Sequence, residues 1–283
     1  MSLAAVYLDR SSGTKAPVQQ LPTSGRQDGP ADRRVRVFGL EVTDTTLAGA
    51  AHWIIDRAMK GERAEVAFLN AHCVNVMYRN RAYRTALERS HQIFADGSGV
   101  RIAARAAGVH LRENVNGTDL LPVLCREAAD AGAPIYFLGA REGIAAAAAR
   151  RMQRETPGLI IAGHHHGYLS DPVDEAAAID AINRSGAKIL LVGLGVPSQE
   201  LWIARNRHRL AAAVVVGVGG LFDYYSGRIP RAPLALRRFG FEWVWRLAME
   251  PRRLANRYLV GNAEFLLRLA VMRALAPAEF QQS

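Results

Sequence analysis

The sequence predicts an α/β fold in which a mainly parallel sheet carries helices on both faces and a small helical appendage follows at the C-terminus. Two observations support this prediction. From residue 35 to residue 218, short apolar runs alternate with longer segments of helical periodicity. Most of the short runs are rich in Val, Ile, Leu and Phe and lack alternating polar residues, which is typical of parallel strands buried on both faces.

The expected strands cover residues 35–40, 65–70, 92–95, 134–139, 159–163, 188–193 and 213–218. The expected helices cover residues 46–60, 74–89, 99–108, 118–131, 142–155, 174–185 and 198–210. Because helical segments separate the strands, the arrangement is expected to be Rossmann-like. The strand at 35–40 differs from the others, since Arg36 lies inside its apolar run.

The chain divides into three regions. Residues 1–34 carry Ser, Gly, Pro, Gln and Asp without apolar periodicity, which predicts a disordered leader. Residues 35–228 are expected to form the α/β core. Residues 229–283 are expected to form a basic, amphipathic appendage, in which residues 241–249, 252–260 and 262–275 have short helical patterns.

The charge of the chain is concentrated in this appendage. The net charge is +10, and residues 228–273 hold ten arginines against three glutamates. These arginines alternate with apolar and aromatic residues, which favours an anionic membrane surface over nucleic acid as the partner. Phe241, Trp243, Trp245 and Phe265 are expected to enter the headgroup region. The alternative is that these aromatic side chains pack on the core and the arginines form a solvated face.

The cysteines and the distribution of apolar residues indicate where in the cell the protein is expected. Cys73 and Cys125 both lie in apolar helical patterns, which is typical of core thiols in a reducing environment. No basic start followed by an apolar stretch marks a signal peptide, and no run of about 18 apolar residues marks a spanning helix. The protein is therefore expected to be cytoplasmic and peripheral on the inner face of the cell membrane.

Two polar residues are expected at the carboxyl edge of the sheet, where ligands bind in such folds. Asp96 follows the strand at 92–95 and precedes Gly97-Ser98-Gly99. A carboxylate in this place can act as a general base if partial burial raises its pKa. Asn70 closes the preceding strand. On local sequence alone, either residue could equally serve as a turn or capping residue.

Glycine-bearing turns supply candidate anion sites. Gly117-Thr118-Asp119 opens the helix at 118–131, where Thr118 is a good N-cap and the free amides could hold an anion. Simple capping explains this segment equally well. Gly139 begins another turn, which contains Arg141 and would suit a diphosphate, although two glycines are a weak signal.

Two further segments follow the last two strands. Residues 193–202 read Gly-Leu-Gly-Val-Pro-Ser-Gln-Glu-Leu-Trp, and Gln199 is expected in the first helical turn, directed at the mouth of the sheet. Residues 217–223 read Gly-Val-Gly-Gly-Leu-Phe-Asp, and Asp223 could bind a ribose or a uracil edge. A capping role is the alternative for Asp223.

Together these segments resemble the WecG/TagA/CpsF glycosyltransferases, glycosyltransferase family 26, over roughly residues 35–260. The family pattern Gly-x-x-x-Pro-x-Gln-Glu-x-Trp matches residues 193–202, and Gly-Val-Gly-(small)-x-Phe-Asp matches residues 217–223. The family's Thr-x-Asn pattern is matched only at Asn70, because Phe68 stands where threonine is usual.

The resemblance implies transfer of a hexose from a UDP-sugar donor to a polyprenyl-diphosphate-linked sugar acceptor, in bacterial cell-surface or exopolysaccharide synthesis. The hexose would be glucose, N-acetylmannosamine or N-acetylmannosaminuronate. Asp96 is implied as the catalytic base, with Asn70 and Gln199 beside it. No cofactor is expected, and a homo-oligomer is left open. The donor-binding residues would be Gly117, Thr118, Asp119, Gly139, Gly193, Gly195, Gly217, Gly219 and Asp223, with Arg228, Arg231, Arg237 and Arg238 as the nearest arginines for the diphosphate.

An inverting transfer without a metal ion is expected. The Asp-x-Asp motif that clamps a metal–diphosphate pair in many glycosyltransferases is absent from the sequence, so helix N-termini and arginines would have to meet the leaving-group charge. His164, His165 and His166 resemble a metal-binding tract. Adjacent residues of a strand point to opposite faces, however, and a loop at the end of a strand is the favoured interpretation.

One alternative function is a peripheral membrane protein that binds a nucleotide without catalysis. It would keep the glycine turns and would tolerate loss of Asp96. A nicotinamide-dependent oxidoreductase is disfavoured, because no Gly-x-Gly-x-x-Gly fingerprint follows the first expected strand.

Overall fold

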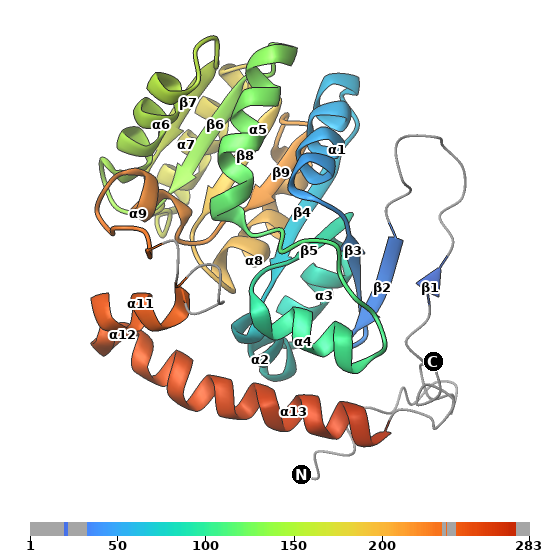
Figure 1. The fold of residues 1–283 in the computed structure, drawn as a ribbon. Coiled ribbons are helices and arrows are strands. Elements are labelled where there is room, and N and C mark those ends of the chain that lie inside the picture. Colours follow the sequence, from blue (N-terminus) through green and yellow to red (C-terminus); the bar gives the residue numbers. More distant parts are fainter. Residues whose placement is uncertain (1–19, 22–32, 234–235, 237–241, 276–283) are drawn as a thin grey trace.

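The computed structural model describes residues 20–21, 33–233, 236 and 242–275. Within these residues, nine strands form one sheet in the order β1-β2-β3-β5-β4-β9-β8-β6-β7 (Figure 1). The strands from β3 to β7 in this order run parallel, and β1 and β2 add an antiparallel edge. The mainly parallel α/β fold expected from the sequence is thus confirmed. The strands are β1 Gln20–Leu21, β2 Arg33–Val37, β3 Leu40–Asp44, β4 Ala64–Leu69, β5 Gln92–Ala95, β6 Ile135–Gly139, β7 Ile161–His165, β8 Ile189–Gly193 and β9 Val214–Gly217.

Helices cover both faces of the sheet. One face carries α1, α5, α6 and α9, and the other carries α2, α3, α4, α7, α8 and α13. Side chains of β4 show the division, because Val66 and Phe68 enter the first core while Ala67 and Leu69 enter the second. The helices are α1 Leu47–Lys60, α2 Ala71–Arg79, α3 Arg81–Arg89, α4 Ser98–Ala106, α5 Gly117–Ala131, α6 Ile144–Glu155, α7 Pro172–Arg184, α8 Ser198–Asn206, α9 Leu221–Tyr225, α11 Glu242–Met249, α12 Pro251–Ala255 and α13 Gly261–Leu275, with short turns η2 Arg207–Arg209 and η3 Asn256–Val260.

The expected strand at 35–40 is wrong, because the chain reverses inside it. β2 ends at Val37 and β3 begins at Leu40, and the two pair antiparallel. Phe38 and Gly39 form the turn with φ angles of 51° and 81°. Two consecutive positive φ values are typical of the tight turns that join strands in a hairpin. The hairpin also draws Arg33 and Arg34, which the sequence placed in the leader, into the sheet.

The expected helix at 74–89 is two helices. Asn80 ends α2 and caps α3, since its side-chain oxygen accepts a hydrogen bond from the Tyr83 amide at 3.0 Å. Asparagine favours such caps because its short side chain competes with the helical backbone. The break places α3 on α8 and leaves α2 free to contact α13.

The C-terminal region contacts the core through its last helix. α13 lies along α2 (Figure 1), and Phe265 and Leu269 belong to the buried core on that face. The Phe265 ring packs edge-on against Phe38 with centroids 5.5 Å apart. The expectation that Phe265 enters a membrane is therefore wrong. Phe241 lies outside the described residues, and Trp243 and Trp245 are half-buried.

Among the described residues, no helix combines the length and apolar character needed to cross a bilayer.

Replacing Phe265 with alanine should lower the free energy of unfolding by about 3–5 kcal/mol, because the ring is 3% exposed and its loss leaves a cavity. Leu266→Ala is the matched control, since the neighbouring Leu266 is 57% exposed and should change stability by roughly 0.5 kcal/mol or less. Urea unfolding measures both. Equal effects of the two substitutions would mean that α13 does not dock on the core.

Candidate active site

The carboxyl ends of β4 and β5 bring Asn70 and Asp96 together. The side-chain nitrogen of Asn70 donates a hydrogen bond to Oδ2 of Asp96 at 3.0 Å. The side-chain oxygen of Asn70 accepts from the Cys73 amide at 3.1 Å, which caps α2. Because the cap fixes which end of the amide faces the helix, the nitrogen is left to hold the carboxylate. One asparagine thus starts a helix and orients Asp96.

Asp96 is half-buried in a mixed electrostatic environment. Burial raises the pKa of its carboxyl group. The Asn70 hydrogen bond and the charges of Arg257 and Arg246 lower the pKa, and the charge of Asp119 raises it. The net shift is upward, which suits a general base that works near neutral pH.

The turn after Asp96 is held from outside the strand. The Gly97 amide donates to the side-chain oxygen of Asn114 at 2.6 Å. Gly97 has a φ of 88°, a left-handed conformation that glycine adopts without strain. The turn therefore has a backbone shape and a hydrogen bond that fix the path of the chain directly after Asp96.

Two arginines that no sequence motif marks lie close enough to Asp96 to act on its charge. Arg246 in α11 stacks over the Tyr224 ring at 5.2 Å, and Arg257 in η3 stacks over Tyr258 at 5.6 Å. The stacking fixes the direction of each guanidinium. The concentration of arginine in the C-terminal region was a signal for such residues, but the sequence alone did not show which of them turn toward the sheet.

The start of α5 is occupied by its own polar contacts. The N-cap is Asn116 and not Thr118, since the Asn116 side-chain oxygen accepts from the Asp119 amide at 2.8 Å. The Asp119 carboxylate accepts from the Asn116 side chain and forms an ion pair with Arg231. Two expected donor-binding residues, Asp119 and Arg231, therefore bind each other. Gly117 lies over the Phe68 ring, so Phe68 adds an apolar side chain beside the start of α5.

A second ion pair joins two further candidates. Oδ1 of Asp223 in α9 accepts from Arg228 at 2.8 Å, and Asp223 is 8% exposed. Arg228 also lies 3.8 Å from Glu250, next to α12. The pair therefore connects the end of the core with the C-terminal helices. Contact of Asp223 with a ribose or uracil stays a prediction.

At three of the expected donor-binding glycines, other protein atoms occupy the space that a side chain would take. A Cβ atom on Gly139 would lie 2.5 Å from the Gly193 oxygen, and one on Gly193 would lie 2.9 Å from the Gly219 oxygen. A Cβ atom on Gly217 would lie 2.8 Å from the side-chain nitrogen of Gln199. These three glycines allow the strand ends and turns to approach one another.

Two other glycines face open space. Gly195 and Gly219 have φ angles of 80° and 58°, and no atom lies within 4 Å of a Cβ built on either. Both follow the carboxyl end of a strand, β8 for Gly195 and β9 for Gly219. The backbone of these two turns is therefore the part of the glycine segments that a ligand can approach closely.

Gln199 and Glu200 are directed into the protein. Gln199 is 3% exposed, and its side-chain oxygen accepts from the Gly219 amide at 2.8 Å. Its side-chain nitrogen donates to Oε1 of Glu200 at 2.8 Å. Glu200 is 5% exposed, and burial raises its pKa to about 7. The implied contact of Gln199 with sugar or acceptor stays a prediction. Trp202 is in the core, as expected.

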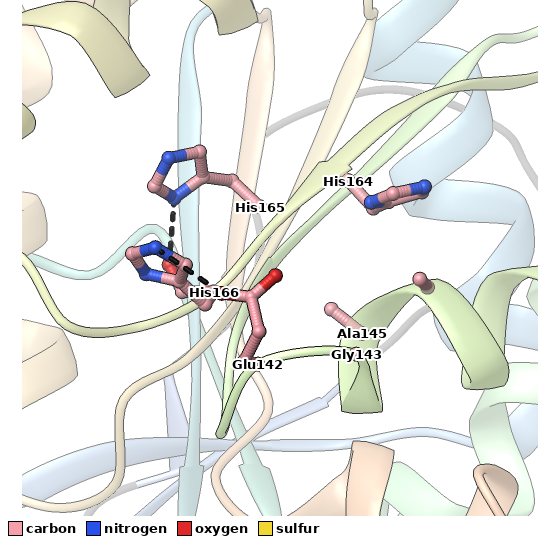
Figure 2. Close-up of a pocket in the computed structure, with 7 residues that line it drawn as sticks. Glu142, Gly143, Ala145, His164, His165 and His166 are labelled. Carbon is pink, nitrogen blue, oxygen red and sulfur yellow. Dashed lines mark hydrogen bonds and ion pairs between the residues drawn. The ribbon is translucent and has the colours of Figure 1, made fainter.

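The histidine tract lines a separate cavity of about 310 Å³ at the start of α6 (Figure 2). His164 and His165 belong to β7, so the strand ends two residues later than expected. In Figure 2, the His164 side chain lies on the same side of β7 as Ala145, whereas the His165 and His166 side chains lie on the opposite side. His166 is 3.4 Å from Glu142. In the part of the chain that the structure describes, no three His, Cys, Asp or Glu side chains are arranged to hold a metal ion.

Arg237 and Arg238, the remaining arginines expected near the diphosphate, lie outside the described residues.

Comparison with known proteins gives one consistent result. Residues 35–278 match the model of the Glycosyl transferase WecG/TagA/CpsF family. A relative from Bacillus spizizenii, named N-acetylglucosaminyldiphosphoundecaprenol N-acetyl-beta-D-mannosaminyltransferase, is 36% identical over 175 residues, which cover 62% of this chain and 67% of the relative. Relatives with the same name from Bacillus subtilis and Staphylococcus aureus are 30% and 29% identical, covering 67% and 66% of this chain and 73% and 72% of their own.

The family match covers the sheet from Val35 of β2 onward, the turns around Asp96 and the C-terminal helices. The chain therefore belongs to the WecG/TagA/CpsF family of glycosyl transferases.

Proposed function

We propose that the protein is an inverting hexosyltransferase that moves a hexose from a UDP-sugar to a polyprenyl-diphosphate-linked sugar without a metal ion. The observation that carries this proposal is the Asn70–Asp96 pair at the carboxyl edge of the sheet, near two arginines of the C-terminal helices. The names of the relatives favour N-acetylmannosamine over glucose and N-acetylmannosaminuronate as the hexose. The same names favour an acceptor that carries N-acetylglucosamine.

Asp96 is the proposed general base. Its Oδ2 is held by Asn70, which leaves Oδ1 to receive the proton of the acceptor hydroxyl. The acceptor oxygen attacks the anomeric carbon as the bond from that carbon to the UDP oxygen breaks. A single displacement of this kind inverts the anomeric carbon. An inverting step agrees with the β linkage in the names of the relatives, because nucleotide sugars of this type carry the sugar in the α linkage.

The departing diphosphate needs positive charge. A Cβ atom on Gly220 would lie 3.4 Å from a guanidinium nitrogen of Arg246, so Arg246 borders the open turn at Gly219. The charge of Arg246 also reaches Asp96. Arg246 therefore lies between the base and the turn proposed to bind the donor, a position that suits the diphosphate. Arg257, which also acts on Asp96, is the second candidate.

The proposal that no metal ion is needed rests on the positive charges of Arg246 and Arg257. The chain has no Asp-x-Asp motif to hold a metal–diphosphate pair. Arginine matches phosphate geometry with paired donors, and it supplies charge without a metal. In this proposal, Arg246 and Arg257 take the place of the cation.

A direct assay tests the function. The protein is incubated with UDP-N-acetylmannosamine, UDP-glucose or UDP-N-acetylmannosaminuronate, a polyprenyl-diphosphate-linked N-acetylglucosamine and EDTA, and released UDP and glycosylated lipid are measured. We expect transfer from the first donor to persist in EDTA. Transfer that requires added Mg²⁺ or Mn²⁺ would contradict the metal-free mechanism. Binding of UDP without transfer from any donor would favour the non-catalytic nucleotide-binding alternative.

Asp96→Asn should lower turnover by roughly 10²–10⁴, the usual contribution of acid–base catalysis, because the amide cannot accept the proton. UDP affinity should change little, since Asp96 is not proposed to contact the nucleotide. Asp171→Asn is the matched control, because Asp171 is exposed and serves as the N-cap of α7, where asparagine caps equally well. Turnover of Asp96→Asn near that of the control would reject Asp96 as the base.

The proposed acceptor is a membrane lipid, and the C-terminal helices carry a face that would suit a membrane surface. Leu259, Val260, Leu266 and Leu267 are each more than half exposed. Arg252 and Arg273 are exposed in the same segment. Apolar side chains flanked by arginines favour an anionic bilayer, where each arginine contributes on the order of 1 kcal/mol. We propose that this face holds the protein peripherally on the inner face of the cell membrane.

The double substitution Leu266→Glu and Leu267→Glu should abolish flotation with phosphatidylglycerol vesicles, because carboxylates oppose entry into an anionic headgroup region. The unchanged protein should float at low salt and release as ionic strength rises. Val173→Glu is the control, since Val173 is 74% exposed on α7. If the double variant floats as well as the control does, α13 is not the membrane-binding face.

A further inference from the structure

Glu200 is a buried carboxyl group to which the proposed reaction gives no role. It lies in the first turn of α8 and is 5% exposed. Its Oε1 accepts from the side-chain nitrogen of Gln199 at 2.8 Å. Its Oε2 has no hydrogen-bond partner among the described residues. An unpaired buried carboxylate oxygen is costly, so Glu200 calls for an explanation beyond packing.

The partner of Glu200 holds the turn after β9. The side-chain oxygen of Gln199 accepts from the Gly219 amide at 2.8 Å, and its side-chain nitrogen lies against Gly217. The three groups therefore form a chain from Glu200 through Gln199 to Gly219. Gly219 is one of the two glycines whose backbone faces open space.

The direction of the Gln199 amide decides whether this chain holds. In the observed direction, nitrogen meets the carboxylate and oxygen meets the Gly219 amide. A flipped amide would place nitrogen against the Gly219 N–H, which sets donor against donor. It would also place oxygen against Glu200, which sets acceptor against acceptor while Glu200 is ionised. An ionised Glu200 thus selects the direction that fixes the turn.

We propose that Glu200 is a positioning residue for donor binding: its carboxylate orients Gln199, and Gln199 fixes the Gly217–Gly219 turn on which the nucleotide diphosphate rests. The proposal depends on the function proposed above, because it takes this turn as part of the donor site. Glu200 acts through Gln199 and does not touch the substrate.

Among the buried titratable groups around Glu200, Glu200 is the one whose protonation changes near neutral pH. The titratable groups that face it are Cys73 of α2 and Tyr83 of α3. Burial raises the pKa of Cys73 to about 12 and raises the pKa of Tyr83, so both stay neutral near pH 7. Burial raises the pKa of Glu200 to about 7. Below that pH, the protonated carboxyl can donate to the Gln199 oxygen, and the preference for the observed amide direction weakens.

The test is the pH dependence of UDP binding, measured by calorimetry from pH 5.5 to 8.5. The affinity of the unchanged protein should fall as pH falls through about 7. In Glu200→Gln, an amide that cannot titrate replaces the carboxyl, so this fall should be smaller by roughly threefold to tenfold, the effect of about one hydrogen bond. The ionisation of UDP itself, near pH 6, affects both proteins alike and cancels in their ratio.

Tyr83→Phe is the matched control. Tyr83 belongs to the same buried cluster, and its hydroxyl interacts with the Cys73 thiol, outside the chain from Glu200 through Gln199 to Gly219. The control should keep the pH dependence of the unchanged protein. Identical pH dependence in the unchanged protein and Glu200→Gln would overturn the proposal.

A second measurement separates this proposal from the proposed function and does not need the variant to fold. Hydrogen exchange on the unchanged protein without ligand reports the protection of the Gly219 amide. Protection should decrease as pH falls through about 7, beyond the intrinsic pH dependence of exchange. Constant protection would overturn the role of Glu200. Absence of UDP binding at every pH, with changing protection, would instead contradict the donor assignment alone.

Discussion

The desolvated carboxylate of Asp96 is the group on which the arrangement of the site depends. Burial opposes its charged form, and the Asn70 hydrogen bond and the charges of Arg257 and Arg246 partly offset that cost. Asn70 can do this only because it also caps α2. The C-terminal helices that carry the arginines contact the core through Phe265 of α13 and through the ion pairs of Arg228 with Asp223 and Glu250. The packing of the C-terminal helices on the core thereby contributes to the charge around the proposed base.

The remainder of the edge is built by close approach of backbone segments. Gly139, Gly193 and Gly217 let strand ends and turns pack within distances that a side chain would not allow. This packing leaves the backbone of Gly195 and Gly219 open. Gln199 accepts a hydrogen bond from the Gly219 amide and donates one to Glu200, so both residues hold the Gly219 turn from the protein interior. The glycine segments therefore divide into residues that shape the edge and residues that a donor could approach.

The sequence predicted the parallel sheet and the place of Asp96 because buried strands and strand-end turns leave local patterns. It did not predict the hairpin at Phe38 and Gly39, since the apolar run continues through the turn. The break at Asn80 was readable as a capping signal. The positions of Arg246 and Arg257 were not predictable, because they depend on how α13 docks. Nor could local sequence show that Gln199 is directed into the protein.

The central claim is that the C-terminal helices and the sheet edge form one active site. The pH dependence of kcat/KM in Arg257→Gln tests it most directly. Removing the positive charge should raise the pKa of Asp96 and move the acidic limb of the profile to higher pH, because Arg257 lowers that pKa in the intact protein. Arg252→Gln, at an exposed arginine of the same segment, should leave the limb in place. An acidic limb that does not move in Arg257→Gln would contradict the account.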